Sequence, residues 1–340
     1  MTKIGVLGAG TWGMALARML LRSGCQVTVW SALPQEVEQL QKTRQHSNLP
    51  GMEIPAEILF TGEIRQVCEN KDILLFAVPS VYVRATAAKA APYIPQGQII
   101  VDVAKGIEPE TLYTLTQVIE DELRKAGNTT ARLVALSGPT HAEEVALDKP
   151  TTIVSASADP EAAARVQDVF MNTCMRVYTN PDVLGVELCG ALKNIIALAA
   201  GISAGLGFGD NAKAAIITRG MVEIARLGRS MGCREETFYG LAGVGDLIVT
   251  ATSSHSRNNR AGMLMGQGVA PQEAVAQIGM VVEGIHALQA AIALSQRYAV
   301  ELPIIQAVDA VVNRGAEPAA TVMALMARDK KAERISGPEV

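Results

Sequence analysis

The stretch that decides the fold is Lys3-Ile4-Gly5-Val6-Leu7-Gly8-Ala9-Gly10-Thr11-Trp12-Gly13, at the start of the chain. An apolar run leads into glycines with the spacing G-x-G-x-x-G, and an amphipathic segment follows. A strand, a glycine turn and a helix in this order direct unpaired N–H groups and the positive end of a helix dipole at one point. That arrangement suits the pyrophosphate of a dinucleotide, because glycine lets a phosphate approach the backbone. A tight turn in an unrelated α/β protein would show the same spacing.

Length and charge limit the classes of function. The chain has 340 residues, which is long for one hydrophobic core, so two domains are expected. Its 30 Lys and Arg face 34 Asp and Glu, and the basic residues are scattered. This distribution offers no surface for nucleic acid or for an anionic membrane. A small molecule is therefore the expected partner.

The cysteines and apolar segments favour a cytoplasmic protein. The five cysteines contain no C-x-x-C pair, and the four histidines show no metal-ligand spacing, so we expect reduced thiols and no metal site. Residues 191–208 come closest to a membrane span, but Lys193 and several glycines interrupt them. We therefore expect no membrane insertion.

The order of apolar runs predicts an α/β protein. The first half alternates β-branched strands with helices, which predicts a Rossmann-type, mostly parallel sheet. The expected strands after the first are 27–30, 73–78, 99–103, 133–136 and 152–155, and the helices between them include 109–126 and 160–170. After Asn180-Pro181 only Ala/Leu/Met-rich segments follow, which predicts an all-helical domain. We place a dinucleotide-binding domain at 1–181 and a helical substrate and catalytic domain at 182–340, with the active site in the cleft between them.

Helix boundaries in the second half follow from capping residues. Asp182 is expected to cap one helix and Asp210 or Asn211 the next, while Pro271 and Pro303 mark later starts. The charged end of the chain after Arg328 is expected to be frayed.

Lys193 is the first candidate for chemistry. It lies within an apolar helix without an acidic neighbour one turn away. A lysine in such a place can lose its proton near neutral pH and act as an acid or a base. The alternative is a side chain that extends to solvent or pairs with a distant carboxylate. The next residue, Asn194, points about 100° around the helix and is expected to brace the domain interface rather than share a ligand with Lys193; a satisfied polar residue at an interface is the equal alternative.

Four further segments carry polar groups that can reach the cleft. Lys105 follows an apolar strand, and Gly138 and Thr140 follow another strand, before a helix. Asp246 follows a glycine-rich turn and can hold a substrate hydroxyl, hold Lys193 or cap a helix. Ser256-Arg257-Asn258 gathers hydroxyl, guanidinium and amide donors, which suits phosphate. Ordinary surface loops explain Lys105 and the Arg257 segment equally well.

Together these motifs resemble the bacterial-type NAD(P)-dependent glycerol-3-phosphate dehydrogenase family over nearly the whole chain. The motifs stand in the family's order: Gly8 to Gly13, Val103-Ala104-Lys105-Gly106, Ser137-Gly138-Pro139-Thr140, Gly190-Ala191-Leu192-Lys193-Asn194, Gly207-Phe208-Gly209, Gly243-Val244-Gly245-Asp246 and Ser256-Arg257-Asn258. The resemblance implies interconversion of dihydroxyacetone phosphate and sn-glycerol 3-phosphate, feeding phospholipid synthesis. It implies that Lys193 is the proton acceptor for alcohol oxidation.

The same resemblance assigns the binding residues. The implied substrate contacts are Lys105, Gly138, Thr140, Asp246, Ser256, Arg257 and Asn258. The cofactor is expected to bind at the glycine turn and to contact residues from both halves of the chain. The implied cofactor residues are Gly8, Gly10, Thr11, Trp12, Gly13, Lys105, Ala142, Arg257, Val282 and Glu283.

The choice between NADP and NAD depends on the end of the second strand. That strand ends Trp30-Ser31-Ala32-Leu33, without the acid that would bind the ribose of NAD and without an arginine for NADP. The missing acid favours NADPH, with NADH tolerated. A homodimer is possible. Two alternatives stay open: a related two-domain dehydrogenase of a hydroxy acid, sugar acid or opine, and a non-catalytic NADPH sensor.

Overall fold

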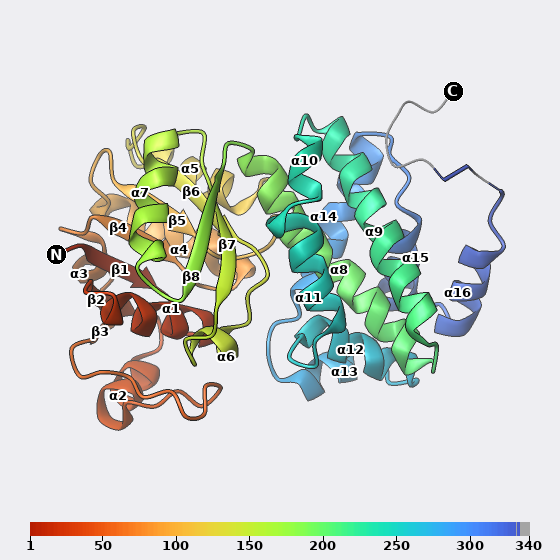
Figure 1. Cartoon of the computed structure of the whole chain (residues 1–340), viewed down its shortest axis with the longest axis horizontal. Helices are drawn as coiled ribbons and strands as arrows, with labels where there is room; N and C mark the ends of the chain where they lie inside the picture. The colour runs from red at the N-terminus through yellow and green to blue at the C-terminus, as the bar shows by residue number, and fades with distance from the viewer. Residues whose placement is uncertain (331, 334–340) are drawn as a thin grey trace.

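The computed structural model describes residues 1–330, 332 and 333, and shows two bodies side by side (Figure 1). A twisted sheet flanked by helices holds the first half of the chain, and a cluster of helices holds the second. Residues 331 and 334–340, on which most of the expected fraying after Arg328 falls, lie outside the described residues.

The first body is built on one eight-stranded sheet of order β3-β2-β1-β4-β5-β6-β7-β8. All neighbours pair in parallel except β6 and β7, which confirms the Rossmann-type, mostly parallel prediction. Two strands were not predicted, because one has three residues and the other alternates exposed polar side chains at the edge of the sheet. The strands are β1 (Lys3–Leu7), β2 (Gln26–Trp30), β3 (Leu59–Thr61), β4 (Ile73–Phe76), β5 (Ile99–Asp102), β6 (Arg132–Ser137), β7 (Thr151–Ala156) and β8 (Met175–Asn180).

Helices cover both faces of this sheet with apolar side chains. One apolar cluster joins α1 and α7 to the sheet, and another joins α3, α4 and α5 to the opposite face. The helices and helical turns of this half are α1 (Thr11–Arg22), α2 (Pro34–Thr43), α3 (Ile64–Cys68), η1 (Ser80–Tyr82), α4 (Val83–Ala90), η2 (Ala91–Tyr93), α5 (Leu115–Lys125), α6 (Ala142–Val145) and α7 (Pro160–Met171).

The helix expected at 109–126 begins later than the sequence suggested. α5 starts at Leu115, because the side chains of Thr114 and Gln117 form a capping box at its N-terminus. Leu112 has a φ of 62°, so the chain before Thr114 turns instead of continuing a helix. The segment that follows Lys105 is therefore a loop.

In the second half one buried helix, α8 (Val183–Gly205), is surrounded by the others. It is long and apolar enough to cross a membrane, but 89% of its apolar window is buried inside the protein. α12 packs against it at glycines, where a Cβ on Gly201 would lie 2.1 Å from the backbone oxygen of Asn259. The other helices of this half are α9 (Asp210–Ser230), α10 (Glu235–Phe238), a π-helical turn η3 (Leu241–Gly245), α11 (Asp246–Thr252), α12 (Arg257–Gly266), α13 (Pro271–Ile278), α14 (Glu283–Arg297), α15 (Pro303–Arg314) and α16 (Pro318–Met326).

Most predicted helix starts agree with the structure. The Asp182 side chain accepts a hydrogen bond from the Gly185 N–H at 3.0 Å and caps α8. Pro271 and Pro303 are the first residues of α13 and α15. The prediction for α9 was wrong by one or two residues, because Gly209 holds the N-cap position.

A buried carboxylate joins the two bodies. Glu187 of α8 accepts hydrogen bonds from the Thr114 Oγ1 at 2.7 Å and the Thr116 N–H at 2.8 Å, and a further one from the Thr116 hydroxyl. These groups begin α5, so the carboxylate satisfies donors at its N-terminus. Burial raises the pKa of Glu187, and the Thr116 and Thr114 donors act against that rise.

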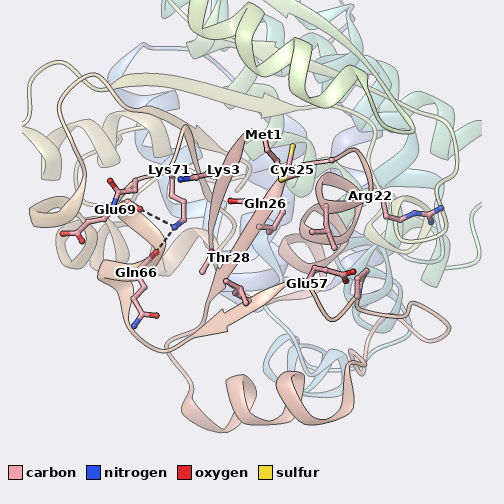
Figure 2. A pocket seen from close by; sticks show the side chains of 16 residues that line it. Met1, Lys3, Arg22, Cys25, Gln26, Thr28, Glu57, Gln66, Glu69 and Lys71 are labelled. Carbon is pink, nitrogen blue, oxygen red and sulfur yellow. Dashed lines mark hydrogen bonds between the residues drawn. The ribbon is translucent and has the colours of Figure 1, made fainter.

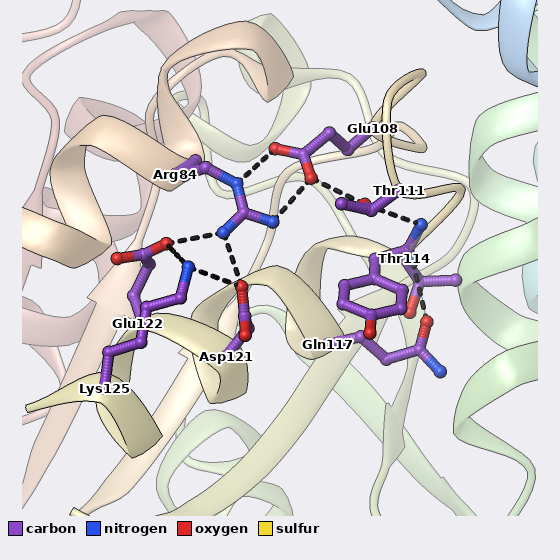
Figure 3. A network of polar contacts seen from close by, with 9 residues as sticks. Arg84, Glu108, Thr111, Thr114, Gln117, Asp121, Glu122 and Lys125 are labelled. Carbon is purple, nitrogen blue, oxygen red and sulfur yellow. Dashed lines mark hydrogen bonds and ion pairs between the residues drawn. The ribbon is translucent and has the colours of Figure 1, made fainter. Parts of the chain in front are cut away.

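The loop between β5 and α5 is held from a second side. Arg84 of α4 binds Glu108 through Nε at 2.5 Å and Asp121 through Nη1 at 2.6 Å (Figure 3). Glu108 in turn accepts a hydrogen bond from Thr111 at 2.6 Å. Because the loop is fixed at both ends, Lys105 near its start has a defined position.

We predict that Glu187→Ala lowers the free energy of unfolding by about 2–4 kcal/mol, because buried donors at the start of α5 lose their acceptor. Glu187→Gln keeps one acceptor oxygen and should cost less. Urea unfolding followed by circular dichroism measures both. A stability of Glu187→Ala equal to that of the parent chain would contradict the joining role of this carboxylate.

Candidate active site

The glycine turn after β1 leaves its backbone open. Gly8 has a φ of +119°, and a Cβ on Gly13 would lie 2.2 Å from the backbone oxygen of Gly8, so packing requires both. At Gly10 a Cβ would meet nothing within 4 Å. α1 also has no side-chain cap at its N-terminus. Free N–H groups beside open space fit the pyrophosphate of a dinucleotide, which Thr11 and Trp12 at the start of α1 would also approach.

A single carboxylate lies between two lysines that come from the two bodies. The Asp246 Oδ1 accepts from the Lys193 Nζ at 2.6 Å, and its Oδ2 accepts from the Lys105 Nζ at 2.7 Å. The Asp246 side chain is 1% exposed and that of Lys193 is 5% exposed. The sequence had left open whether Asp246 holds Lys193 or caps a helix, and in the structure its carboxylate holds both lysines.

The environment of Lys193 brings its proton into the physiological range. Burial lowers the pKa of the Lys193 amine to about 7, Lys105 lowers it as well, and Asp246 opposes the change. An amine with such a pKa can donate or accept a proton at neutral pH. This is the behaviour required of a general acid and base.

Thr250 is a site residue that the sequence analysis missed. The Lys193 Nζ donates to the Thr250 Oγ1 at 2.5 Å, and that hydroxyl donates to the backbone oxygen of Asp246 at 2.7 Å. With Asp246 and Thr250 holding two of its N–H groups, the ammonium has one left for a ligand. The spacing of Asp246 and Thr250, one turn apart on α11, was the available signal.

Lys105 joins the β5 and β6 ends to α8. Its Nζ also donates to the Gly138 backbone oxygen at 3.2 Å, and the Thr140 hydroxyl donates to the same oxygen at 3.1 Å. A Cβ on Gly190 would lie 3.4 Å from the Lys105 Cγ, so α8 passes close to this lysine. Lys105, Gly138 and Thr140 therefore lie together with Lys193 and Asp246 at one edge of the sheet.

The Ser256-Arg257-Asn258 segment forms the start of α12. The Ser256 hydroxyl caps this helix by accepting from the Asn259 N–H at 3.2 Å. Both ends of the Asn258 amide are used inside the helical body, by Asn194 at 2.9 Å and by the Gly284 N–H at 2.8 Å. Within the described residues the guanidinium of Arg257 makes no polar contact, so it is the group of this segment that is available to an anion.

The contacts of Asn194 differ from the expectation that it braces the domain interface. Its amide donates to the Gly190 backbone oxygen one turn earlier, and its oxygen accepts from Asn258. Both partners belong to the helical body. The prediction was wrong because the small residues of α12 and α14 let that asparagine reach a partner inside its own half.

The remaining predicted cofactor residues lie at the same edge. The Glu283 carboxylate at the start of α14 accepts hydrogen bonds from the Ser80 N–H at 3.2 Å and from the Ser80 hydroxyl, across the boundary between the bodies. Val282, the N-cap residue of α14, is 1% exposed. Ala142 is the first residue of α6.

Two histidines meet near this edge without having been predicted to do so. The rings of His141 and His255 lie 5.8 Å apart, centroid to centroid. Burial lowers the pKa of His141. The two residues are far apart in sequence, which left no pattern to detect.

The opposite edge of the sheet has a hollow of about 960 Å³ at the amino ends of β1 and β2 (Figure 2). Of the basic groups that line this hollow, the Lys71 Nζ donates to the backbone oxygens of Gln66 and Glu69 at 2.9 and 3.3 Å. Ligands of open α/β sheets bind beyond the carboxyl ends of the strands, where the lysines and the glycine turn lie. We therefore assign the active site to that edge. Among the residues that the structure describes, no three His, Cys, Asp or Glu side chains gather to hold a metal.

Comparison with known proteins shows the same family over both bodies. Family models described as the N-terminus and C-terminus of NAD-dependent glycerol-3-phosphate dehydrogenase match residues 3–163 and 182–323. The chain is 67% identical to a glycerol-3-phosphate dehydrogenase [NAD(P)+] of Lactobacillus delbrueckii, with 98% of this chain and 99% of the relative covered. It is 49% identical to that of Agathobacter rectalis, with 99% of both chains covered. The crystal structure of glycerol-3-phosphate dehydrogenase from Coxiella burnetii superposes with a TM-score of 0.91 at 35% identity, covering 96% of this chain and 99% of that one.

We predict that Asp246→Asn lowers the pKa of Lys193 further below its value of about 7, because an opposite charge is lost while Lys105 remains. Titration by NMR with lysine labelled at the ε-carbon measures this value, and a Lys193→Met sample assigns the resonance. Thr250→Ser, which keeps a hydroxyl, serves as the matched control and should change the pKa little. An unchanged pKa in Asp246→Asn would mean that the carboxylate does not govern the amine.

Proposed function

The chain belongs to the NAD-dependent glycerol-3-phosphate dehydrogenase family, and we propose that Lys193 moves the substrate proton in its reaction. The enzyme is an oxidoreductase that interconverts dihydroxyacetone phosphate and sn-glycerol 3-phosphate with NAD(P)H. One observation carries the role of Lys193: its buried amine, with a pKa near 7, lies between Asp246 and Thr250 and has one N–H left for a ligand.

The chain's own residues would hold the nicotinamide dinucleotide at the glycine turn. The free N–H groups of Gly10, Thr11 and Trp12 suit its pyrophosphate, as Gly8 and Gly13 shape the turn. We assign further contacts to residues around the same edge: Lys105, Ala142, Arg257, Val282 and Glu283. When bound, this group gives or takes a hydride at the substrate carbon.

In the reductive direction the Lys193 ammonium donates its proton to the carbonyl oxygen, which becomes a hydroxyl as its carbon receives a hydride. In the oxidative direction the neutral amine accepts the hydroxyl proton. Asp246 and Thr250 orient the Nζ for both directions. Lys105 places a positive charge beside the developing negative charge on the substrate oxygen, which lowers the barrier.

Arg257 is the group we assign to the substrate phosphate. A guanidinium binds a phosphate through two parallel hydrogen bonds, and Arg257 has no partner among the described residues that would compete. Ser256 and Asn258 hold the backbone of this segment, so their role in substrate binding is to place Arg257. Lys105, Gly138 and Thr140 complete the pocket. A dehydrogenase of a carboxylate substrate would not need this guanidinium.

The setting of the reaction is also a proposal. The product supplies phospholipid synthesis, and we place the enzyme in the cytoplasm because its cysteines are free and α8, the one long apolar helix among the described residues, is a core helix. No membrane insertion is proposed.

α16 supports a homodimer, since its Met323 and Met326 are 64% and 78% exposed and none of its residues is buried. Sedimentation equilibrium of the parent chain and of Met326→Glu tests the dimer, which the charge should weaken.

Replacing Lys193 with Met should lower kcat by about 10²-fold or more, because the proton-transfer group is removed. Binding of the dinucleotide should persist. In the parent enzyme, kcat/KM for reduction should fall, and for oxidation should rise, as the pH increases through about 7, because reduction needs the ammonium and oxidation the amine. Absorbance of NADH at varied pH measures these rates. A Lys193→Met enzyme with a near-normal kcat would refute the assignment.

Replacing Arg257 with Lys should raise KM for dihydroxyacetone phosphate about tenfold with a smaller change in kcat, because two parallel hydrogen bonds become one point charge. Activity on unphosphorylated dihydroxyacetone should be low in both enzymes and unaffected by the change. Arg260→Lys, an exposed arginine on the same helix, is the matched control. An unchanged KM would place the phosphate elsewhere, and preference for a carboxylate substrate would favour a different dehydrogenase.

A further inference from the structure

The loop after β2 brings a carboxylate back to the end of that strand. Ser31 follows the last residue of β2, and its hydroxyl donates to the Glu36 Oε2 at 2.5 Å. The same Ser31 oxygen accepts from the Leu33 N–H at 3.1 Å, which closes the turn into α2. Glu36 is in the first turn of this helix. The residues that directly follow β2 include no acid, but Glu36 of α2 places a carboxylate at the end of this strand.

The end of β2, where Ser31 holds Glu36, lies beside the glycine turn, because the Gly8 N–H donates to the Trp30 backbone oxygen at 2.9 Å. His46 is 8% exposed, and the Ala9 backbone acts on its ring as a hydrogen-bond partner. The negative charge of Glu36 also acts on this ring and partly opposes the lowering of its pKa by burial. In the same loop, the Asn48 Nδ2 lies 3.4 Å from the Thr11 Oγ1 at the start of α1. Glu36, His46 and the dinucleotide turn thus lie side by side.

One oxygen of this carboxylate is available to a ligand. Ser31 occupies the Oε2, and within the described residues the Glu36 Oε1 makes no hydrogen bond. Glu36 is half-buried, so part of its side chain is open to solvent. A carboxylate oxygen accepts hydrogen bonds and donates none, which suits a hydroxyl and repels a phosphate.

The cations near this strand end are engaged elsewhere. Residues 31–36 contain no lysine or arginine. The Arg44 Nη1 donates to the backbone oxygens of Pro55 and Ile58 at 3.3 and 2.9 Å, and the guanidinium lies over the Phe60 ring. The Lys89 ammonium lies over the Trp30 ring at 5.4 Å from its centroid, in the apolar cluster on the α4 side of the sheet.

We propose that Glu36 hydrogen-bonds the adenosine ribose of the bound dinucleotide and makes this enzyme prefer NADH to NADPH. The proposal rests on the proposed function and deepens it at the cofactor end of the same site. In a dinucleotide-binding sheet, an acid at the end of the second strand accepts from the ribose 2′-hydroxyl. A 2′-phosphate at this place would meet the Glu36 carboxylate and no arginine. In the sequence, the strand ending Trp30-Ser31-Ala32-Leu33 favoured NADPH because no acid stands there. The acid that reaches this strand end in the structure is Glu36, five residues after Ser31.

Binding of NADH and of NADPH to the parent chain tests this inference without turnover. The chain has two tryptophans, Trp12 at the glycine turn and Trp30 at the end of β2, so energy transfer from tryptophan to the reduced nicotinamide reports occupancy. We expect NADH to bind about tenfold or more tightly than NADPH, as expected for one charge-assisted hydrogen bond.

The variant Glu36→Gln should reduce this ratio about tenfold, chiefly by tighter binding of NADPH. Glu38→Gln removes the same charge from an exposed position on the same helix and should leave the ratio unchanged. The ratio of kcat/KM for the two cofactors with dihydroxyacetone phosphate should follow the binding ratio.

Three results would overturn the inference: tighter binding of NADPH by the parent chain, an unchanged ratio in Glu36→Gln, or equal changes in Glu36→Gln and Glu38→Gln. These outcomes leave the proposed function standing, because either cofactor would still support the reaction. Failure of the parent chain to bind NADH and NADPH, or to reduce dihydroxyacetone phosphate with either one, would instead contradict the proposed function.

Discussion

The buried Asp246 carboxylate is the constraint on which the active site depends. Its two oxygens accept from Lys105 of the sheet body and from Lys193 of the helical body. A buried charge is costly unless it is paired, so these three side chains are stable only when the two bodies are packed together. Burial, with a smaller contribution from the charge of Lys105, lowers the pKa of Lys193 and makes its proton transferable at neutral pH.

The same helix that carries Lys193 also anchors the two bodies to each other. α8 is apolar around most of its circumference, and its two charged side chains, Glu187 and Lys193, both reach groups that belong to the cleft or to the sheet body. Glu187 holds the start of α5, and Arg84 holds the loop before it. Lys105 lies at the beginning of that loop. The residues that hold the two bodies together and the residues proposed for catalysis thus belong to one network. A shift of α8 would move Lys193 directly and Lys105 through the loop that Glu187 helps to hold.

Local patterns account for much of what the sequence predicted correctly. The glycine turn, the apolar strands and the caps at Asp182, Pro271 and Pro303 depend on neighbours a few residues away. The errors occurred where distant contacts decide. β3 and β8 are ordered by pairing with β2 and β7, and the start of α5 is set by its capping box. Asn194 finds its partner on α12, which no pattern along α8 indicates.

The sequence by itself determined the two-body α/β architecture, the dinucleotide turn and the candidate residues of the site, because strand periodicity, glycine spacing and isolated charges are properties of short segments. The tertiary structure decided which of these groups meet. It placed Asp246 between two lysines that are 88 residues apart, added Thr250 to them, and returned Glu36 to the end of β2. The physical reason is that a pKa and a hydrogen-bond partner depend on burial and distance in space, and these exist only once the chain has folded.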